Sequence, residues 1–152
     1  MIKKLLIVPL FLLATTLSSC TFKDDESWKE KFGTPELFLN NAYGYKYVYK
    51  YYRFEDENKY SDTDDTILNA IKEAGPFEKS TEKDNYVERF FTYDGFRFDS
   101  TMGINYCIMS IWDDGYVQIH HKSALGPHSY LHFSIAEVKA IQLNDLVFNL
   151  LN

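Results

Sequence analysis

Apolar and polar side chains alternate along several stretches of this chain, as they do in β-strands. The first such stretch runs from Tyr43 to Phe54, and tyrosines occupy every second position as far as Tyr51. Tyrosine and valine favour extended structure, and a period of two places alternate side chains on opposite faces of a sheet. The pattern therefore predicts a strand here.

Three further stretches have the features of helices. Thr34-Pro35-Glu36 combines a hydroxyl N-cap with proline at the first helical position, which predicts a short helix. Residues 62–74 begin with aspartates and end at Gly75-Pro76, as helices commonly do. Ser134-Ile-Ala-Glu137 has the form of a capping box and predicts a helix reaching about Leu150. That helix is apolar around most of its circumference, so we expect it to be buried against the sheet.

Two hairpins are predicted in the second half of the chain. In the first, Asp94-Gly95 forms a two-residue turn between strands at 90–93 and 96–98. In the second, the loop is 113–115, because a two-residue turn would mix apolar and polar side chains on one face. A third strand at 129–134 extends the resulting apolar face. That face consists of Cys107, Met109, Ile111, Val117, Ile119, Leu131 and Phe133.

These elements predict an α+β fold. We expect a mostly antiparallel sheet of about five or six strands, with helices 62–74 and 135–150 packed on one face. Residues 34–152 form a single domain that is long enough to bury a hydrophobic core.

The sheet face opposite the predicted core is unusually aromatic. Tyrosine and tryptophan combine apolar area with a hydrogen-bonding group, so this face is a candidate platform for a sugar, a peptide or a partner protein. The alternative is that another layer covers it, such as the Tyr43–Tyr51 strand or the first helices. The candidate binding face comprises Tyr106, Trp112, Tyr116, Gln118, His120, Tyr130 and His132.

The N-terminus has the order of an export signal. Lys3 and Lys4 precede the apolar run from Leu5 to Leu13, and small and hydroxyl residues follow. A positive start, a hydrophobic middle and small residues at the cut are typical of secretory signal peptides. The run is too short to span a bilayer as a stable helix.

Leu17-Ser18-Ser19-Cys20 resembles the lipobox of bacterial lipoproteins. This resemblance implies that residues 1–19 are removed as a signal peptide and that Cys20 receives a diacylglycerol and becomes the mature N-terminus. Residues 20–33 would then be the lipidated cysteine and a short acidic tether. The alternatives are an ordinary secretory signal with an unmodified cysteine, or an uncleaved anchor.

The resemblance also implies an address in the bacterial cell envelope. In a Gram-positive host this is the outer face of the plasma membrane. In a Gram-negative host Thr21 after the cysteine resembles outer-membrane sorting, and Lys23-Asp24-Asp25-Glu26 resembles the signal of surface-exposed lipoproteins. A solvated charged linker explains the same four residues equally well.

Net charge limits the partners. The whole chain has 16 basic and 22 acidic residues, and loss of Lys3 and Lys4 with the leader leaves 14 basic residues and a charge of −8. An acidic domain of this kind argues against binding nucleic acid. The expected partners are the lipid bilayer, through acylated Cys20, and an envelope protein, peptide or glycan.

The sequence contains no motif that indicates catalysis, a metal or a cofactor. Nucleophile elbows, phosphate-binding glycine loops and metal-ligand spacings are missing from it. Asp62, Asp64 and Asp65 suggest calcium, but a helix N-terminus explains them better. Cys107 is expected to be a buried, unreactive thiol. We therefore expect a non-enzymatic protein that binds a ligand.

Two other functions remain open. One is an envelope hydrolase that works through His120 and His132, which are expected on the same sheet face. The other is a purely structural component of the envelope.

Overall fold

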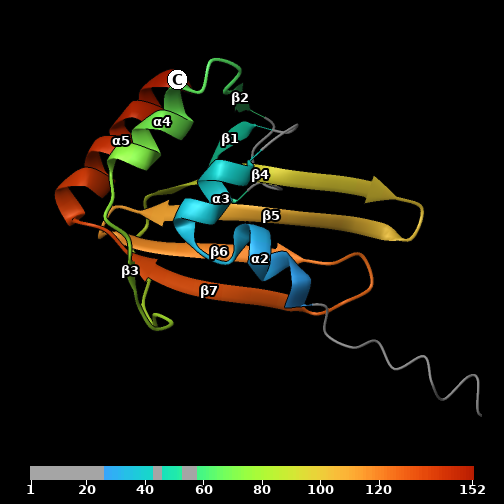
Figure 1. Ribbon diagram of the computed structural model, residues 1–152. Coiled ribbons are helices and arrows are strands. Elements are labelled where there is room, and N and C mark those ends of the chain that lie inside the picture. The colour runs from blue at the N-terminus through green and yellow to red at the C-terminus, as the bar shows by residue number, and fades with distance from the viewer. Residues whose placement is uncertain (1–25, 43–45, 53–57) are drawn as a thin grey trace, which may run out of the picture.

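The computed structural model describes residues 26–42, 46–52 and 58–152, and this part of the chain has the α+β fold that the sequence predicts. A seven-stranded antiparallel sheet carries helices on one face (Figure 1). The strand order is β2-β1-β4-β5-β6-β7-β3. The strands are β1 (Tyr47–Lys50), β2 (Lys59–Ser61), β3 (Glu78–Lys79), β4 (Phe90–Ser100), β5 (Gly103–Trp112), β6 (Tyr116–Lys122) and β7 (His128–Ser134).

Seven strands are observed where five or six were expected. The difference lies in β2 and β3, which have three and two residues and are too short to show an alternating pattern. The predicted strand around residues 43–54 is observed as β1, whereas Tyr43, Tyr45 and Phe54 lie outside the described residues.

The first helices lie within residues 20–33, which were predicted to be a tether. The helices are the short helix η2 (Glu26–Trp28), α2 (Lys29–Phe32), α3 (Pro35–Asn41), α4 (Thr66–Glu73) and α5 (Glu137–Leu150). Trp28 and Phe32 are buried, so residues 26–33 of the predicted tether region pack on the domain. Residues 1–19 and Cys20 lie outside the described residues. No helix in the described ranges is long and apolar enough to cross a membrane.

The hairpin between β5 and β6 has the predicted register. Met109 lies opposite Ile119 and Ile111 opposite Val117, and the backbone at Gly115 has φ +87°. The third strand is also confirmed, because Phe133 lies opposite Val117. Period-two patterning across a buried face therefore predicted the register correctly.

The predicted turn at Asp94-Gly95 is wrong. β4 continues through these residues, with a β-bulge between Asp94 and Phe96, and the turn into β5 lies at residues 100–103. A Cβ atom on Gly95 would lie 2.5 Å from Cζ of Phe38, so only glycine allows the α3 ring to pack this closely. The bulge keeps Tyr93 and Phe96 on the same buried face, where Met109 and Cys107 lie opposite them.

The predicted N-cap of the first helix is confirmed, whereas the predicted N-cap of the last helix is wrong. The Thr34 hydroxyl accepts a hydrogen bond from the Leu37 amide at 3.2 Å, as predicted. The capping box at Ser134 is wrong, because Ser134 is the last residue of β7 and α5 begins at Glu137 without a side-chain cap. The Ile135 amide instead donates to the Gly115 carbonyl at 2.9 Å, which continues the sheet contacts past the predicted cap.

Asp62 organises the start of α4. Its fully buried carboxylate accepts hydrogen bonds from the amides of Ile67 (2.9 Å) and Leu68 (2.8 Å) and from the Tyr93 hydroxyl (3.0 Å). Burial, together with the neighbouring Asp62 carboxylate, raises the pKa of Tyr93, so this phenol remains a donor. The helix N-terminus therefore explains this aspartate, as the sequence predicts.

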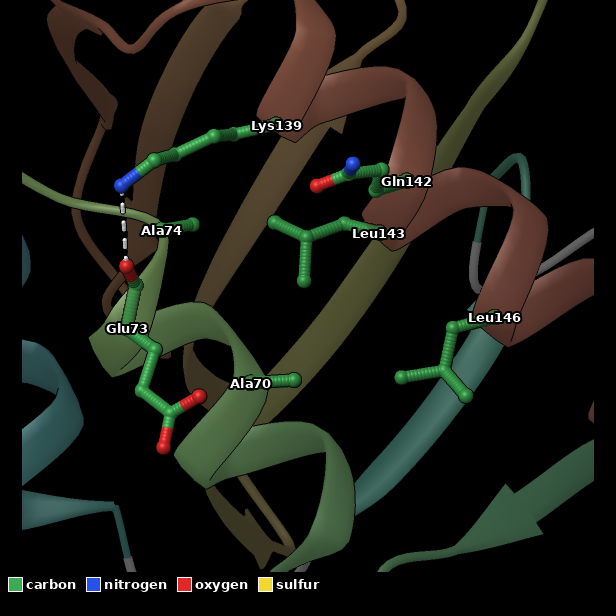
Figure 2. A pocket seen from close by; sticks show the side chains of 7 residues that line it. All are labelled: Ala70, Glu73, Ala74, Lys139, Gln142, Leu143 and Leu146. Carbon is green, nitrogen blue, oxygen red and sulfur yellow. Dashed lines mark hydrogen bonds between the residues drawn. The ribbon is translucent and has the colours of Figure 1, made fainter.

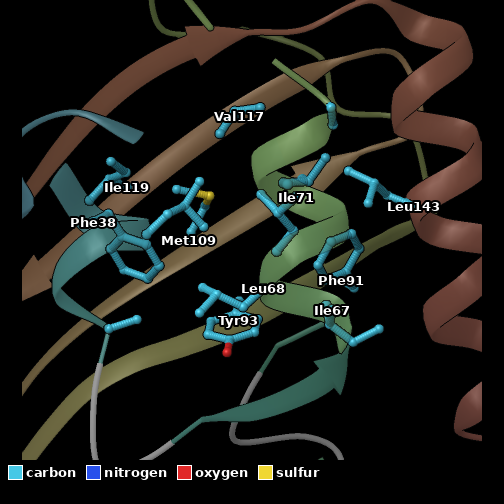
Figure 3. Packing of buried hydrophobic residues seen from close by; sticks show 14 of the residues in the cluster. Phe38, Ile67, Leu68, Ile71, Phe91, Tyr93, Met109, Val117, Ile119 and Leu143 are labelled. Carbon is cyan, nitrogen blue, oxygen red and sulfur yellow. The ribbon is translucent and has the colours of Figure 1, made fainter. Parts of the chain in front are cut away.

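The core fills the space between the helices and one sheet face (Figure 3). α5 contributes one buried stripe to it, including Leu143 and Val147, and Asn144 donates to the Ile111 carbonyl at 3.2 Å. This stripe confirms the expectation that the helix is buried against the sheet, while its other side faces water, where Val138 is 62% exposed and Ile141 is 37% exposed. One buried stripe is enough because only one side of the helix meets the sheet.

Candidate functional site

The sheet face opposite the helices is hollowed into a cavity of ≈ 550 Å³, which we call the aromatic groove. Ligand pockets usually measure roughly 300–1,000 Å³, so the hollow has an appropriate size. Five of the seven residues of the predicted binding face line it: Tyr106, Trp112, Gln118, His120 and Tyr130. Strand alternation thus placed these side chains correctly.

Tyr116 and His132, the other two predicted residues, lie on the same face without lining the hollow. Their side chains bond to each other instead, with 2.6 Å between the Tyr116 hydroxyl and Nδ1 of His132. Burial and the neighbouring Tyr86 hydroxyl raise the pKa of Tyr116, so its phenol stays neutral. These two residues support the groove from beside it.

The floor of the groove is buried and closely packed. Tyr106, Ile108, Ser110 and Trp112 project from alternate positions of β5, and each is at most 7% exposed. The Trp112 indole stacks on Phe90 with a centroid distance of 4.7 Å and an interplanar angle of 21°. This packing fixes the indole before any ligand arrives.

One wall comes from the segment between β3 and β4, which the sequence analysis did not connect with the site. Tyr86 is 46% exposed, and its ring lies 5.3 Å from Trp112 and 5.6 Å from Tyr116. Glu82 of the same segment and Tyr52 also line the hollow. A single tyrosine within the polar stretch 80–88 was the signal in the sequence that could have indicated an exposed aromatic contact.

The rim nearest the β6–β7 loop is built from stacked rings. His120 and Tyr130 stack at 4.4 Å with an interplanar angle of 16°. Nε2 of His120 lies 2.7 Å from Nδ1 of His128, the first residue of β7. His120 is therefore hydrogen-bonded to His128, while His132, the other member of the predicted hydrolase pair, is bonded to Tyr116.

The lining is mostly aromatic and apolar, with a few polar groups and little formal charge. Gln118 and the two imidazoles supply donors and acceptors, and Glu82 supplies a carboxylate. None of the described residues that line the groove is lysine or arginine. Such a lining can stack against flat apolar surfaces and hydrogen-bond to hydroxyl or amide groups, and it offers no cation to an anionic ligand.

Cys107 lies on the opposite, helix-covered face. It is fully buried, as predicted, and burial raises the pKa of its thiol well above the ordinary value. Over the ranges that the structure describes, no group of three or more histidine, cysteine, aspartate or glutamate residues is placed to hold a metal ion.

A second hollow, of ≈ 260 Å³, lies between α4 and α5 (Figure 2). Its polar end is the Lys139 ammonium, which donates to the carbonyls of Glu73 (3.2 Å) and Gly75 (2.9 Å) at the end of α4. A cation at a helix C-terminus is favourable. This contact joins the two helices and explains the lysine structurally.

Comparisons with protein-family models, with curated proteins and with solved structures find no match to this chain. What the aromatic groove binds must therefore follow from the chemistry of its own lining.

Proposed function

We propose that this protein is a lipid-anchored lipoprotein of the bacterial cell envelope that binds a neutral oligosaccharide in the aromatic groove. The proposed ligand class is supported by the groove itself, which is a hollow of ≈ 550 Å³ with a fixed indole in its floor. Partly exposed tyrosine rings surround that floor. The role is binding rather than catalysis.

A sugar fits this lining better than a charged ligand does. The apolar faces of pyranose rings can pack against Tyr86 and Tyr130, each 46% exposed, because these rings present apolar area with a polar end. Gln118 and His120 can hydrogen-bond to the ring hydroxyls. Glu82, the single acidic residue among the described residues of the lining, disfavours phosphate and other anions.

The lipid anchor is supported by the leader and by the cysteine that ends it. One acyl chain gives only marginal membrane binding, whereas two or three chains on Cys20 would hold the domain at a membrane. The proposed address is the outer membrane of a Gram-negative host, including its surface, or the outer face of the plasma membrane of a Gram-positive host.

Fluorescence titration tests the ligand class. Trp28 stacks on His121 on the other face of the sheet, so a Trp28→Phe background leaves Trp112 as the only indole. Neutral gluco-oligosaccharides and chito-oligosaccharides are expected to change the Trp112 emission saturably. No response to either, with a response to peptides instead, would contradict the proposed ligand class. If no envelope fraction changes the Trp112 emission, the result would favour a purely structural role.

Replacing Tyr86 by alanine is expected to weaken oligosaccharide binding by about tenfold, the loss typical of an exposed aromatic contact. The fold should tolerate the change because Tyr86 is 46% exposed. Val87→Ala is the matched control, since Val87 is also exposed but does not line the groove. Equal affinities of the two variants in the same titration would remove Tyr86 from the binding site.

A further inference from the structure

Three large apolar side chains are exposed together at one end of the sheet, at a surface we call the distal tip. Phe98 is 60% exposed, Met102 65% and Leu125 51%. Phe98 and Met102 belong to the β4–β5 hairpin, and Leu125 belongs to the β6–β7 loop. The two loops touch, because a Cβ atom on Gly103 would lie 2.8 Å from the Ala124 carbonyl oxygen.

The described chain begins at this same end. Trp28, in the first helical turn, stacks on His121 with a centroid distance of 4.6 Å. His121 is the penultimate residue of β6, and the loop that carries Leu125 begins after the next residue. Figure 1 shows the blue start of the chain and the two loops at the same end of the sheet, with α5 at the other end.

Chain length then limits how far this end can lie from the proposed anchor. Five residues lie between Cys20 and Glu26, and the six residue-to-residue steps of a fully extended chain span at most about 20 Å. We propose that the distal tip inserts its three apolar side chains into the lipid bilayer to which acylated Cys20 is attached. This proposal rests on the proposed function, because it takes the anchor as given.

The charged groups near the distal tip have partners within the protein, which lowers the cost of moving the tip out of water. Arg97 and Asp99 form an ion pair with 2.8 Å between Nε and Oδ1, and the Lys122 ammonium donates to the Gly126 carbonyl at 2.6 Å. These charged groups therefore have partners within the protein when the tip leaves water. Apolar loops of this kind bind at the boundary between headgroups and acyl chains, where buried apolar area determines the affinity.

Membrane contact at the distal tip would also orient the aromatic groove. His128, on the groove rim, is the first residue of β7 and follows the Leu125 loop directly. Trp112 lies at the other end of β5. The groove would therefore extend away from the bilayer surface, with its histidine rim closest to the lipid.

Site-directed fluorescence in vesicles tests the contact. The lipidated protein, carrying Met102→Cys labelled with an environment-sensitive fluorophore, is placed in phosphatidylcholine vesicles with and without nitroxide-labelled phosphatidylcholine. Cys107 is buried and Cys20 is blocked by the acyl groups, so the label is specific. Val138→Cys is the matched control, since Val138 is 62% exposed on α5 at the other end of the sheet.

The label at position 102 is expected to shift to the blue and to be quenched by the nitroxide lipid, whereas the label at 138 shows neither change. Adding Phe98→Ser and Leu125→Ser should reduce the quenching at 102 while the protein still floats with the vesicles. Floating protein without quenching at 102 would overturn the tip contact and leave the anchor intact. A blue shift without quenching would mean that the distal tip contacts a second copy of the protein instead of lipid. That result would also overturn the tip proposal. Protein that does not float at all would refute the anchor, and the tip proposal with it.

Discussion

Replacing Trp112 by alanine is expected to destabilise the protein by about 3–5 kcal/mol, the range for truncating a buried aromatic residue. Trp112 is 3% exposed and, with Phe90 and Tyr116, forms a small second core on the groove face. Its indole stacks on Phe90 at 4.7 Å and lies 5.1 Å from Tyr116. Removing it leaves a cavity under the groove and takes away the surface on which Tyr86 rests.

Urea unfolding followed by circular dichroism measures this loss. Trp112→Phe is the matched control, because a phenyl ring keeps the stack on Phe90 and should cost less than half as much as alanine. A loss below about 1 kcal/mol for the alanine variant would show that the indole is not the packed floor of the groove. Measuring oligosaccharide binding by the Trp112→Phe variant separates the contribution of the Trp112 indole to ligand affinity from its contribution to the stability of the fold.

Replacing Asp62 by alanine is expected to cost about 3–5 kcal/mol, because three donors lose their acceptor together and hydrogen bonds to charged groups are strong. Two of the donors are amides in the first turn of α4, at Ile67 and Leu68, and the third is the Tyr93 hydroxyl. All lie in a region from which water is excluded, since Asp62 and Tyr93 are fully buried. Thermal or urea unfolding gives the value.

Two further variants resolve the contributions at Asp62. Tyr93→Phe removes one hydrogen bond and should cost about 1–2 kcal/mol. Asp64→Ala is the matched surface control, because the Asp64 carboxylate is exposed and accepts hydrogen bonds from Thr66 alone among the described residues, through its amide at 3.2 Å and through its side chain. If Asp62→Ala is no more destabilising than Asp64→Ala, the buried carboxylate does not organise the start of α4.

Period-two patterning predicted the central sheet because a wrong register there would turn buried side chains toward water. The β5–β6 register, with Ile111 opposite Val117, follows directly from that penalty. The same alternation placed Trp112 and His120 on the groove face. Side-chain direction within a strand is a local property, so it can be predicted without knowing the rest of the fold.

The errors occur where contacts distant in the sequence overrule a local signal. Asp94-Gly95 has the composition of a turn, yet pairing with β5 and packing of the Phe38 ring over Gly95 keep the strand extended. Ser134 has the composition of a cap, yet it remains paired in β7. Tyr86 reaches the groove from a segment without periodicity, so no strand pattern could place it, and Tyr52 lies past the end of β1, where the predicted alternation no longer applies. The seven-stranded width likewise depends on edge pairings of two or three residues.

The attachment of lipid at Cys20 is the claim on which the envelope address and the membrane contact of the distal tip both depend. Mass spectrometry of the N-terminal peptide, from protein isolated from its native host, tests it most directly. We predict a peptide that begins at Cys20, lacks residues 1–19 and carries a diacylglycerol on the cysteine sulfur. A peptide with an unmodified Cys20 thiol and the leader still attached would contradict the account.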